Sequence, residues 1–229
     1  MRTFAVISDV HANLEALEAV LGELGGLDLY CLGDLVDYGA NPNEVIEMVR
    51  RRGARTLMGN HDSAVLSGDV SLFNARAAMS SRWSASHLTA DSAGYLRALP
   101  PDIRVRVEGA EFYFTHGSRD DRLWEYVDPR THSDLFAHYL GKTEADAIGL
   151  GHTHIPYVWR EGRRVVFNPG SVGQPRDGDR RASFAVVTVD GAEVAAEVRR
   201  VEYDYERAGS KIRSAGLPVS FADRLKAGS

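Results

Sequence analysis

Five short segments combine glycine or a chain turn with residues that can bind metals or move protons. They are Asp9-Val10-His11, Gly33-Asp34-Leu35-Val36-Asp37, Gly59-Asn60-His61-Asp62, His116-Gly117 and Gly151-His152-Thr153-His154. Each follows a stretch that the sequence predicts to be a buried strand. In open α/β sheets, ligands bind beyond the carboxyl ends of the strands. A single His or Asp at a strand end is usually a turn former, but five such segments in one chain favour a metal site.

The side chains of this set indicate which metals it could bind. Asp9 and His11 are two residues apart, as are His152 and His154, so each pair can point to one side of an extended chain. The set offers carboxylates, imidazoles and one amide oxygen, that of Asn60, and no thiolate. Mixed nitrogen and oxygen ligands suit Mn, Fe, Zn or Ni and do not suit Ca or Cu(I).

The charges of the set favour two metal ions. Asp9 and Asp34 bring about −2, whereas two divalent ions bring about +4, so the site keeps a positive charge that matches a phosphate ester. Two such ions, ~3.5–4 Å apart, can polarise phosphoryl oxygens and lower the pKa of a bridging water. A proton donor is then needed near the leaving group. His61 fits that role, and Asp62 could orient it or raise its pKa.

Three further residues have both a functional and a structural interpretation. Asn13 could support the site from behind His11, although it is more often the N-cap of the following helix. Asp37 could hydrogen-bond a ligand histidine or shape its loop. Arg176 lies in the loop 170–177, which contains Gly and Pro; it could meet a phosphate or belong to a solvated turn.

Aromatic residues offer a surface on which a nucleotide base could stack. The candidates are Trp83, Tyr95, Trp124 and Tyr126. Aromatic residues at helical spacing belong more often to the core, so we expect these to be packing residues.

The first third of the chain alternates strand and helix patterns. Expected strands cover Phe4–Ser8, Asp28–Leu32 and Arg55–Met58, and expected helices run over Asn13–Leu24 and from Asn41 to Gly53. This βαβαβ pattern predicts parallel strands with right-handed crossovers.

After residue 71 the pattern changes. Residues 71–99 are rich in Ala, Ser and Leu and predict two helices that end at Pro100-Pro101. This segment could cover the site and select the substrate, or pack against a second subunit. Strand-like runs then follow, with turns at Gly109-Ala110 and Asp190-Gly191 that predict mostly antiparallel pairing. The expected strands are Ile103–Val107, Glu111–Thr115, Ala147–Leu150, Val165–Asn168, Phe184–Asp190 and Glu193–Tyr203.

These elements predict an α/β (α+β) fold in which two packed mixed β-sheets are flanked by helices, an αββα sandwich. No linker or repeat divides the chain, so we expect one domain over residues 1–229. The helical segment at about 71–99 would be an insertion in it, and residues 204–229 would form a C-terminal helical tail. That tail could clasp the domain or make a homo-oligomer contact.

Composition narrows the class of protein. The formal net charge of −5 argues against broad attraction to nucleic acid or to an anionic membrane. The single cysteine, Cys31, excludes an internal disulfide framework. The segment Met1–Asp9 is too short and too soon polar for a signal peptide, and no apolar run approaches the roughly 20 residues that span a bilayer. We therefore expect a cytoplasmic protein.

Taken together, these motifs resemble the calcineurin-like metallophosphoesterase superfamily over almost the whole chain, from Phe4 to about Tyr203. The runs Ser-Asp-Val-His-Ala-Asn-Leu-Glu-Ala-Leu and Asn-Pro-Gly-Ser-Val-Gly-Gln-Pro-Arg look like its small prokaryotic phosphodiesterases and dinucleoside-polyphosphate hydrolases. The resemblance implies that His61 contacts the scissile phosphate and is the general acid. It also implies ligands: Asp9, His11 and His154 for one metal, Asn60, His116 and His152 for the other, and Asp34 between them.

One departure bears on the substrate. Protein Ser/Thr phosphatases of this superfamily carry an arginine where this chain has Tyr38 after Asp37, which weakens a protein-phosphatase interpretation. We expect a dinuclear-metal phosphoesterase that acts on a phosphodiester or phosphoanhydride of a small nucleotide-like substrate, with Mn as the assay metal. The alternatives are a broad phosphomonoesterase and a non-catalytic interaction scaffold, and a nuclease is disfavoured by the charge.

Overall fold

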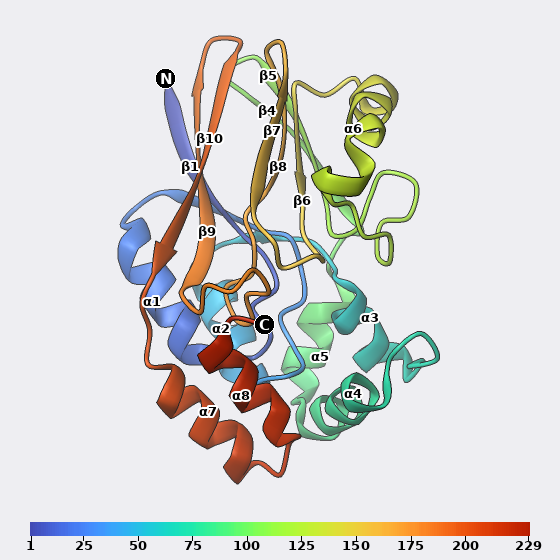
Figure 1. The fold of residues 1–229 in the computed structure, drawn as a ribbon, viewed down its shortest axis with the longest axis vertical. Helices are drawn as coiled ribbons and strands as arrows, with labels where there is room; N and C mark the ends of the chain where they lie inside the picture. The colour runs from blue at the N-terminus through green and yellow to red at the C-terminus, as the bar shows by residue number, and fades with distance from the viewer.

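Two five-stranded mixed sheets pack face to face, and helices cover their outer faces (Figure 1). This computed structural model describes the backbone of residues 1–229 and every side chain except those of Pro129, Thr131, His132 and Ser133. The expected two-sheet architecture is confirmed. Within the described chain, no helix is both long and apolar enough to cross a membrane.

The first sheet has the strand order β10-β9-β1-β2-β3. Strands β1, β2 and β3 are parallel, as the βαβαβ pattern predicts, and β9 pairs antiparallel with both β1 and β10. The strands are β1 (Arg2–Ile7), β2 (Asp28–Cys31), β3 (Arg55–Thr56), β9 (Ala182–Asp190) and β10 (Glu193–Val201). The crossovers run through α1 (Leu14–Leu24) and α2 (Pro42–Arg51).

The second sheet has the order β4-β5-β6-β8-β7. Its strands are β4 (Asp102–Val107), β5 (Ala110–Thr115), β6 (Ala147–Leu150), β7 (Tyr157–Glu161) and β8 (Arg164–Asn168). After residue 71 the pairing is mostly antiparallel, as expected: β4 with β5, β7 with β8, and β9 with both β10 and β1. The exception is β6, which is parallel to both β5 and β8, because α6 (Pro129–Thr143) carries the chain back between β5 and β6. Strand β7 was not expected, because it is an exposed edge strand without regular alternation of apolar residues.

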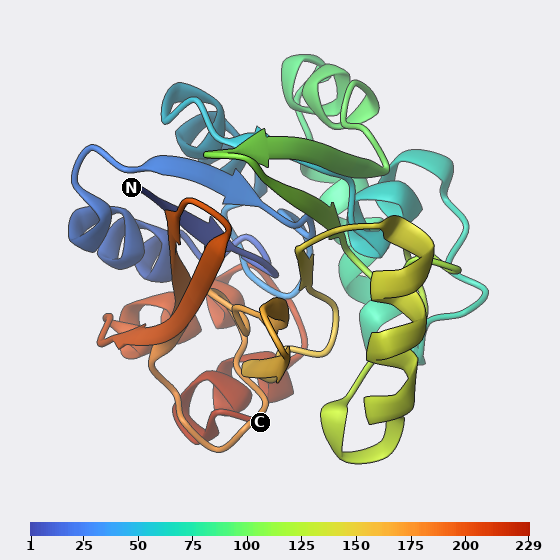
Figure 2. The same cartoon turned by 90° about the horizontal axis from the view of Figure 1, so that it is seen from above.

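Alternation along the strands fills the space on both sides of each sheet. In β1, Phe4 and Val6 face the second sheet, where they pack against residues such as Phe112. Ala5 and Ile7 point the other way and join the core under α1 and α2. The strand period of two residues therefore gives β1 two buried faces. Figure 2 shows α1 and α6 on opposite sides of the paired sheets.

The remaining helices gather at the end of the molecule where β1 and β2 terminate (Figure 1). They are α3 (Asn60–Ser67), α4 (Ala75–His87), α5 (Ala90–Arg97), α7 (Tyr205–Ser214) and α8 (Val219–Ala227). Helices α4 and α5 are the two expected within residues 71–99, and α7 and α8 form the helical tail expected over residues 204–229. A small apolar cluster joins α4 to α7 and α8 and includes Tyr38 and Phe221.

Candidate active site

Loops from both sheets meet at one place and are held there by backbone hydrogen bonds. Asp9 N–H donates to the Gly33 carbonyl (3.0 Å), and Gly173 N–H donates to the Asp9 carbonyl (2.9 Å). On the second sheet, Gly151 N–H donates to the His116 carbonyl (2.9 Å). The strand ends that the sequence places apart along the chain are thus adjacent in space.

The backbone of these loops is strained. Ten non-glycine residues of the described chain have positive φ, and eight of them belong to the site loops. Such conformations cost of order 1–3 kcal/mol each for residues other than glycine. Their concentration here indicates that packing and hydrogen bonds hold the loops in place to aim particular side chains. The eight are Asp9, His11, Ala12, Asp34, Asp37, Tyr38, His152 and His154.

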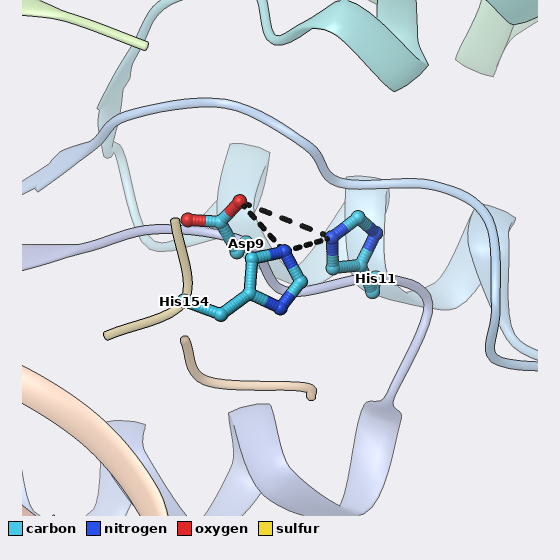
Figure 3. Close-up of side chains that lie close together, drawn as sticks. All are labelled: Asp9, His11 and His154. Carbon is cyan, nitrogen blue, oxygen red and sulfur yellow. Dashed lines mark hydrogen bonds and ion pairs between the residues drawn. The ribbon is translucent and has the colours of Figure 1, made fainter. Parts of the chain in front are cut away.

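One cluster of potential ligands consists of Asp9, His11 and His154, which point toward one another (Figure 3). His11 Nε2 lies 3.1 Å from His154 Nε2. Asp9 Oδ1 lies 3.2 Å from His154 Nε2 and 3.9 Å from His11 Nε2. All three side chains are buried.

A second cluster consists of Asp34, His116 and His152. Asp34 Oδ2 lies 3.2 Å from His116 Nε2, and the same nitrogen lies 2.9 Å from Asn60 Oδ1. Asp34 Oδ2 is also 3.7 Å from His11 Nε2 of the first cluster. The Asp34 carboxylate therefore lies between the two clusters.

Backbone carbonyls fix the orientation of His11, His116, His152 and His154. A carbonyl only accepts hydrogen bonds, so the ring nitrogen that faces it carries the proton and the other nitrogen keeps its lone pair. Metal-binding histidines are commonly held in this way. The pairs are His11 Nδ1 with Val36 (2.9 Å), His116 Nδ1 with Leu32 (2.8 Å), His154 Nδ1 with Gln174 (2.5 Å) and His152 Nε2 with Trp124 (3.2 Å).

The arrangement fits a bound cation. With their Nδ1 atoms protonated, His11 and His154 direct two lone pairs at each other across 3.1 Å. Among the described side chains, Asp9 Oδ1 and Asp34 Oδ2 are buried oxygens that receive no hydrogen bond. A buried group of this kind carries a desolvation cost unless a partner is present. Divalent cations would satisfy both the carboxylate oxygens and the lone pairs.

Electrostatics within the site act in the same direction. Burial favours the neutral form of Asp34, yet the positive charges of protonated His116 and His61 outweigh it and hold the pKa of Asp34 well below its ordinary value. Burial opposes protonation of His116, but the Asp34 carboxylate raises its pKa to about 9, so a metal ion at His116 would displace a proton. Burial, with the His154 imidazole beside it, lowers the pKa of His11 well below its ordinary value. An ionised carboxylate and a neutral imidazole are the protonation states that bind metals.

His61 forms a third group of potential ligands with His11 and Asp34, which belong to the first and the second cluster. Its Nδ1 lies 2.6 Å from Asp37 Oδ2, its Nε2 lies 3.1 Å from the Tyr38 hydroxyl, and its ring stacks on Phe73 with centroids 4.4 Å apart. Burial opposes protonation, but the Asp34 and Asp37 carboxylates raise the pKa of His61 above its ordinary value. Its backbone N–H also donates to Asp34 Oδ1 (2.9 Å).

The hydrogen bonds of Asp62 go to the backbone. Its carboxylate accepts N–H groups from Asp34 (2.8 Å), Leu35 (2.9 Å) and Gly59 (3.0 Å). Asp62 thus holds the Asp34 loop against the start of α3, and the carboxylate that contacts the His61 ring is that of Asp37. Burial, together with the neighbouring Asp34, raises the pKa of Asp62 to about 7.

Asn13 has two contacts. Its Oδ1 accepts the Ala16 N–H (3.2 Å), which makes it the N-cap of α1. Its Nδ2 donates to the Gly173 carbonyl (2.9 Å), which ties α1 to the loop 170–177. The capping interpretation is confirmed, and the second contact supports the loop that carries Gln174.

Tyr38 belongs to the site, although the sequence analysis did not predict a role for it. There it was noted only as the residue that stands in place of an arginine of the protein Ser/Thr phosphatases. Its ring lies 4.5 Å from the His11 ring and 4.8 Å from the His61 ring, between centroids. The Arg176 guanidinium lies 6.0 Å from the Tyr38 ring centroid. The adjacency of Tyr38 to Asp37 was the one available signal.

The aromatic residues before α6 differ from the expectation of core packing. Trp124 and Tyr126 lie in the loop before the helix, and Tyr126 is 53% exposed. The Tyr126 ring lies 4.0 Å from the His152 ring, between centroids. These residues border the site because the loop that carries them folds back over His152.

Known proteins resemble this chain in sequence and in fold. Residues 1–192 match the model of the calcineurin-like phosphoesterase superfamily domain. The chain is 36% identical to an uncharacterized protein of Methanocaldococcus jannaschii, over 96% of each chain. It is 26% identical to Phosphodiesterase YfcE of Escherichia coli, over 82% of this chain and 89% of that protein. A crystal structure of a metallophosphoesterase from Sphaerobacter thermophilus shares 36% identity and superposes with a TM-score of 0.85, covering 99% of this chain and 100% of that one.

Proposed function

This chain belongs to the calcineurin-like phosphoesterase superfamily and is a metal-dependent phosphoesterase, and from that premise we propose that it hydrolyses a phosphodiester or phosphoanhydride of a small nucleotide-like substrate at a dinuclear metal site. One observation carries the proposal. Asp34 Oδ2, which receives no hydrogen bond, lies between two clusters of side chains that can hold metals.

The proposed ligands divide between the two clusters. Asp9, His11 and His154 would hold one ion, and Asp34 would be shared. Asn60, His116 and His152 would hold the other, with His152 using the Nδ1 atom that its bond to the Trp124 carbonyl leaves free. Divalent ions bound there supply Lewis-acid polarisation of the phosphate and a more acidic water. Their identity is proposed to be Mn, Fe, Zn or Ni, given the donor set.

We assign His61 the role of general acid. Its pKa is raised, so the ring favours the protonated form that can deliver a proton to the leaving oxygen. Asp37 holds Nδ1, which leaves Nε2 directed toward the Tyr38 hydroxyl. Asp37 is fully buried, which limits the movement of this pair.

A phosphodiester or phosphoanhydride is preferred over a monoester as the substrate class. The relative from Escherichia coli is named a phosphodiesterase, and Tyr38 occupies the position of the arginine that the protein phosphatases of the superfamily carry. A small phosphorylated substrate also suits a chain whose net charge of −5 disfavours nucleic acid.

Hydrolysis of bis-p-nitrophenyl phosphate and of p-nitrophenyl phosphate tests the proposal, with Mn and with chelator. We expect metal-dependent turnover of the diester that His61→Ala largely abolishes. His138→Ala, which removes an exposed histidine from α6, is the matched control and should keep full activity. Turnover of the monoester alone would replace the proposal with a phosphatase. Bound metal without turnover of either compound would favour an interaction scaffold.

A further inference from the structure

A pocket adjoins the reaction centre on the side of Tyr38. It has a volume of about 460 Å³, and three arginines from distant parts of the chain line it. Arg76 comes from α4, Arg176 from the loop after β8 and Arg224 from α8. Figure 1 shows α4 and α8 at the same end of the molecule. The other lining residues are Tyr38, Asn74, Ala75, Tyr126, Ser220 and Phe221.

Among the side chains that the structure describes, no carboxylate oxygen lies within 4.0 Å of a guanidinium nitrogen of these three arginines. Arginines nearby do have one: Arg200 pairs with Asp177, and Arg213 with Asp223. The Arg176 Nε atom is buried and has no hydrogen-bond partner. The pocket therefore concentrates positive charge that the protein itself leaves uncompensated.

Arg224 is close enough to both other guanidinium groups to be affected by them. Burial, and after it the Arg176 guanidinium, lowers the pKa of Arg224, and Arg76 acts in the same direction. Like charges gathered in one pocket destabilise the folded chain unless an anion joins them. Arginine forks bind phosphate oxygens in pairs, so phosphate is the anion that this arrangement suits best.

Tyr38 connects the pocket to the reaction centre. The Tyr38 ring contacts the rings of His11 and His61. It also contacts the ring of Phe221 in α8, and the centroids of these two rings are 4.8 Å apart. The Arg176 guanidinium lies near the same ring. A phosphate in the pocket would thus be next to, and separate from, the phosphate held at Asp34 and His61.

We propose that the pocket of Arg76, Arg176 and Arg224 is an anion subsite that binds a second phosphate of the substrate, beyond the phosphate that is hydrolysed. The inference rests on the proposed function and narrows it to substrates with two or more phosphate groups, such as a chain of phosphoanhydrides. Helix α8, at the C-terminal end of the chain, is then a part of the substrate site.

Steady-state kinetics test the subsite with two substrates. Diadenosine tetraphosphate carries further phosphates, whereas bis-p-nitrophenyl phosphate has a single one. Arg224→Ala and Arg76→Ala should each raise KM for the tetraphosphate about tenfold, the loss expected for a charge-assisted hydrogen bond, and leave KM for the diester unchanged. Lys226→Ala removes an exposed cation from the same helix and should change neither value. Equal effects of Arg224→Ala on both substrates would overturn the proposal.

Calorimetry separates failure of the subsite from failure of the proposed function. Inorganic tripolyphosphate is titrated into the chain of residues 1–229 after treatment with chelator. Circular dichroism checks that the treated protein keeps its fold. We expect binding that Arg224→Ala and Arg76→Ala each weaken about tenfold and that Lys226→Ala preserves. Lack of binding by the unmutated chain, or equal binding by the arginine variants, would overturn the subsite, whatever the phosphoesterase assays give.

Discussion

The Nδ1 atom of His61 lies 2.6 Å from Asp37 Oδ2, and both side chains are buried. Asp37 is three residues after Asp34, whose carboxylate accepts the backbone N–H of His61 (2.9 Å). One short loop, residues 33–38, therefore carries both the carboxylate shared by the metal clusters and the carboxylate that orients the proposed proton donor. Movement of this loop would disturb both functions together.

The first prediction separates the charge of Asp37 from its shape. His61→Ala should lower kcat by about 10²–10⁴, the usual contribution of a general acid. Asp37→Asn can still accept the Nδ1–H bond but loses the charge, so its kcat should fall by about 10–100-fold with metal content unchanged. Steady-state assays on bis-p-nitrophenyl phosphate measure both. Asp91→Asn, an exposed carboxylate on α5, is the control. Full activity of Asp37→Asn would contradict the role given to this pair.

The second prediction concerns metal removal. Bound metal stabilises the folded state in proportion to RT ln(1 + [M]/Kd), about 2.7 kcal/mol at one hundred times Kd. For a chain of this size, Tm should rise by about 5–11 °C for each ion that binds when Mn is added to protein treated with chelator. His154→Ala removes one imidazole of the first cluster and should reduce the rise. Calcium does not suit this donor set, and a similar rise with calcium would count against it. Thermal scans and metal analysis measure these effects.

The third prediction concerns the carboxylate beneath the site. Asp62 accepts three backbone N–H groups, so Asp62→Asn sets one N–H₂ group against these donors. Leaving a buried donor unsatisfied costs about 1–3 kcal/mol, and metal affinity should fall about 10–100-fold because the Asp34 loop loosens. Urea unfolding and metal titration measure the two losses. Asp69→Asn, an exposed residue in the loop after α3, should change neither. An unchanged metal affinity in Asp62→Asn would show that the loop is held by other contacts.

Much of this site could be predicted from the sequence, since its residues sit where strands end. A short apolar run followed by Asp9 or Asp34 indicates both a strand and the chemistry at its end. The contacts that orient those residues could not be predicted. The Gln174 carbonyl bonds to His154, and the Trp124 carbonyl bonds to His152, through loops whose paths depend on tertiary packing.

Some elements outside the active site also could not be predicted from local sequence patterns. Strand β7 carries Arg160 and Glu161 on an exposed edge and lacks the apolar alternation that marks a strand. The pairing of β1 with β9 joins strands that are far apart in the sequence, and no local pattern specifies it. Arg76 and Arg224 each resemble an ordinary helix-surface cation in sequence. Both arginines line the same pocket because α8 packs near α4.

The last prediction uses glycine to test how closely the loops must approach. A Cβ atom on Gly59 would overlap the backbone nitrogen and the carboxylate of Asp34, so Gly59→Ala forces this loop apart. The cost should be about 1–3 kcal/mol, as for overpacking, and metal affinity should fall because Asp34 is displaced. Gly22 lies in α1 with no neighbouring atom within 4 Å of such a Cβ. Gly22→Ala should therefore stabilise the chain by about 0.4–1 kcal/mol and leave metal affinity unchanged. Thermal and urea unfolding with metal titration compare the two variants. If Gly59→Ala bound metal as tightly as Gly22→Ala, the Asp34 carboxylate could not depend on the close approach of these two loops.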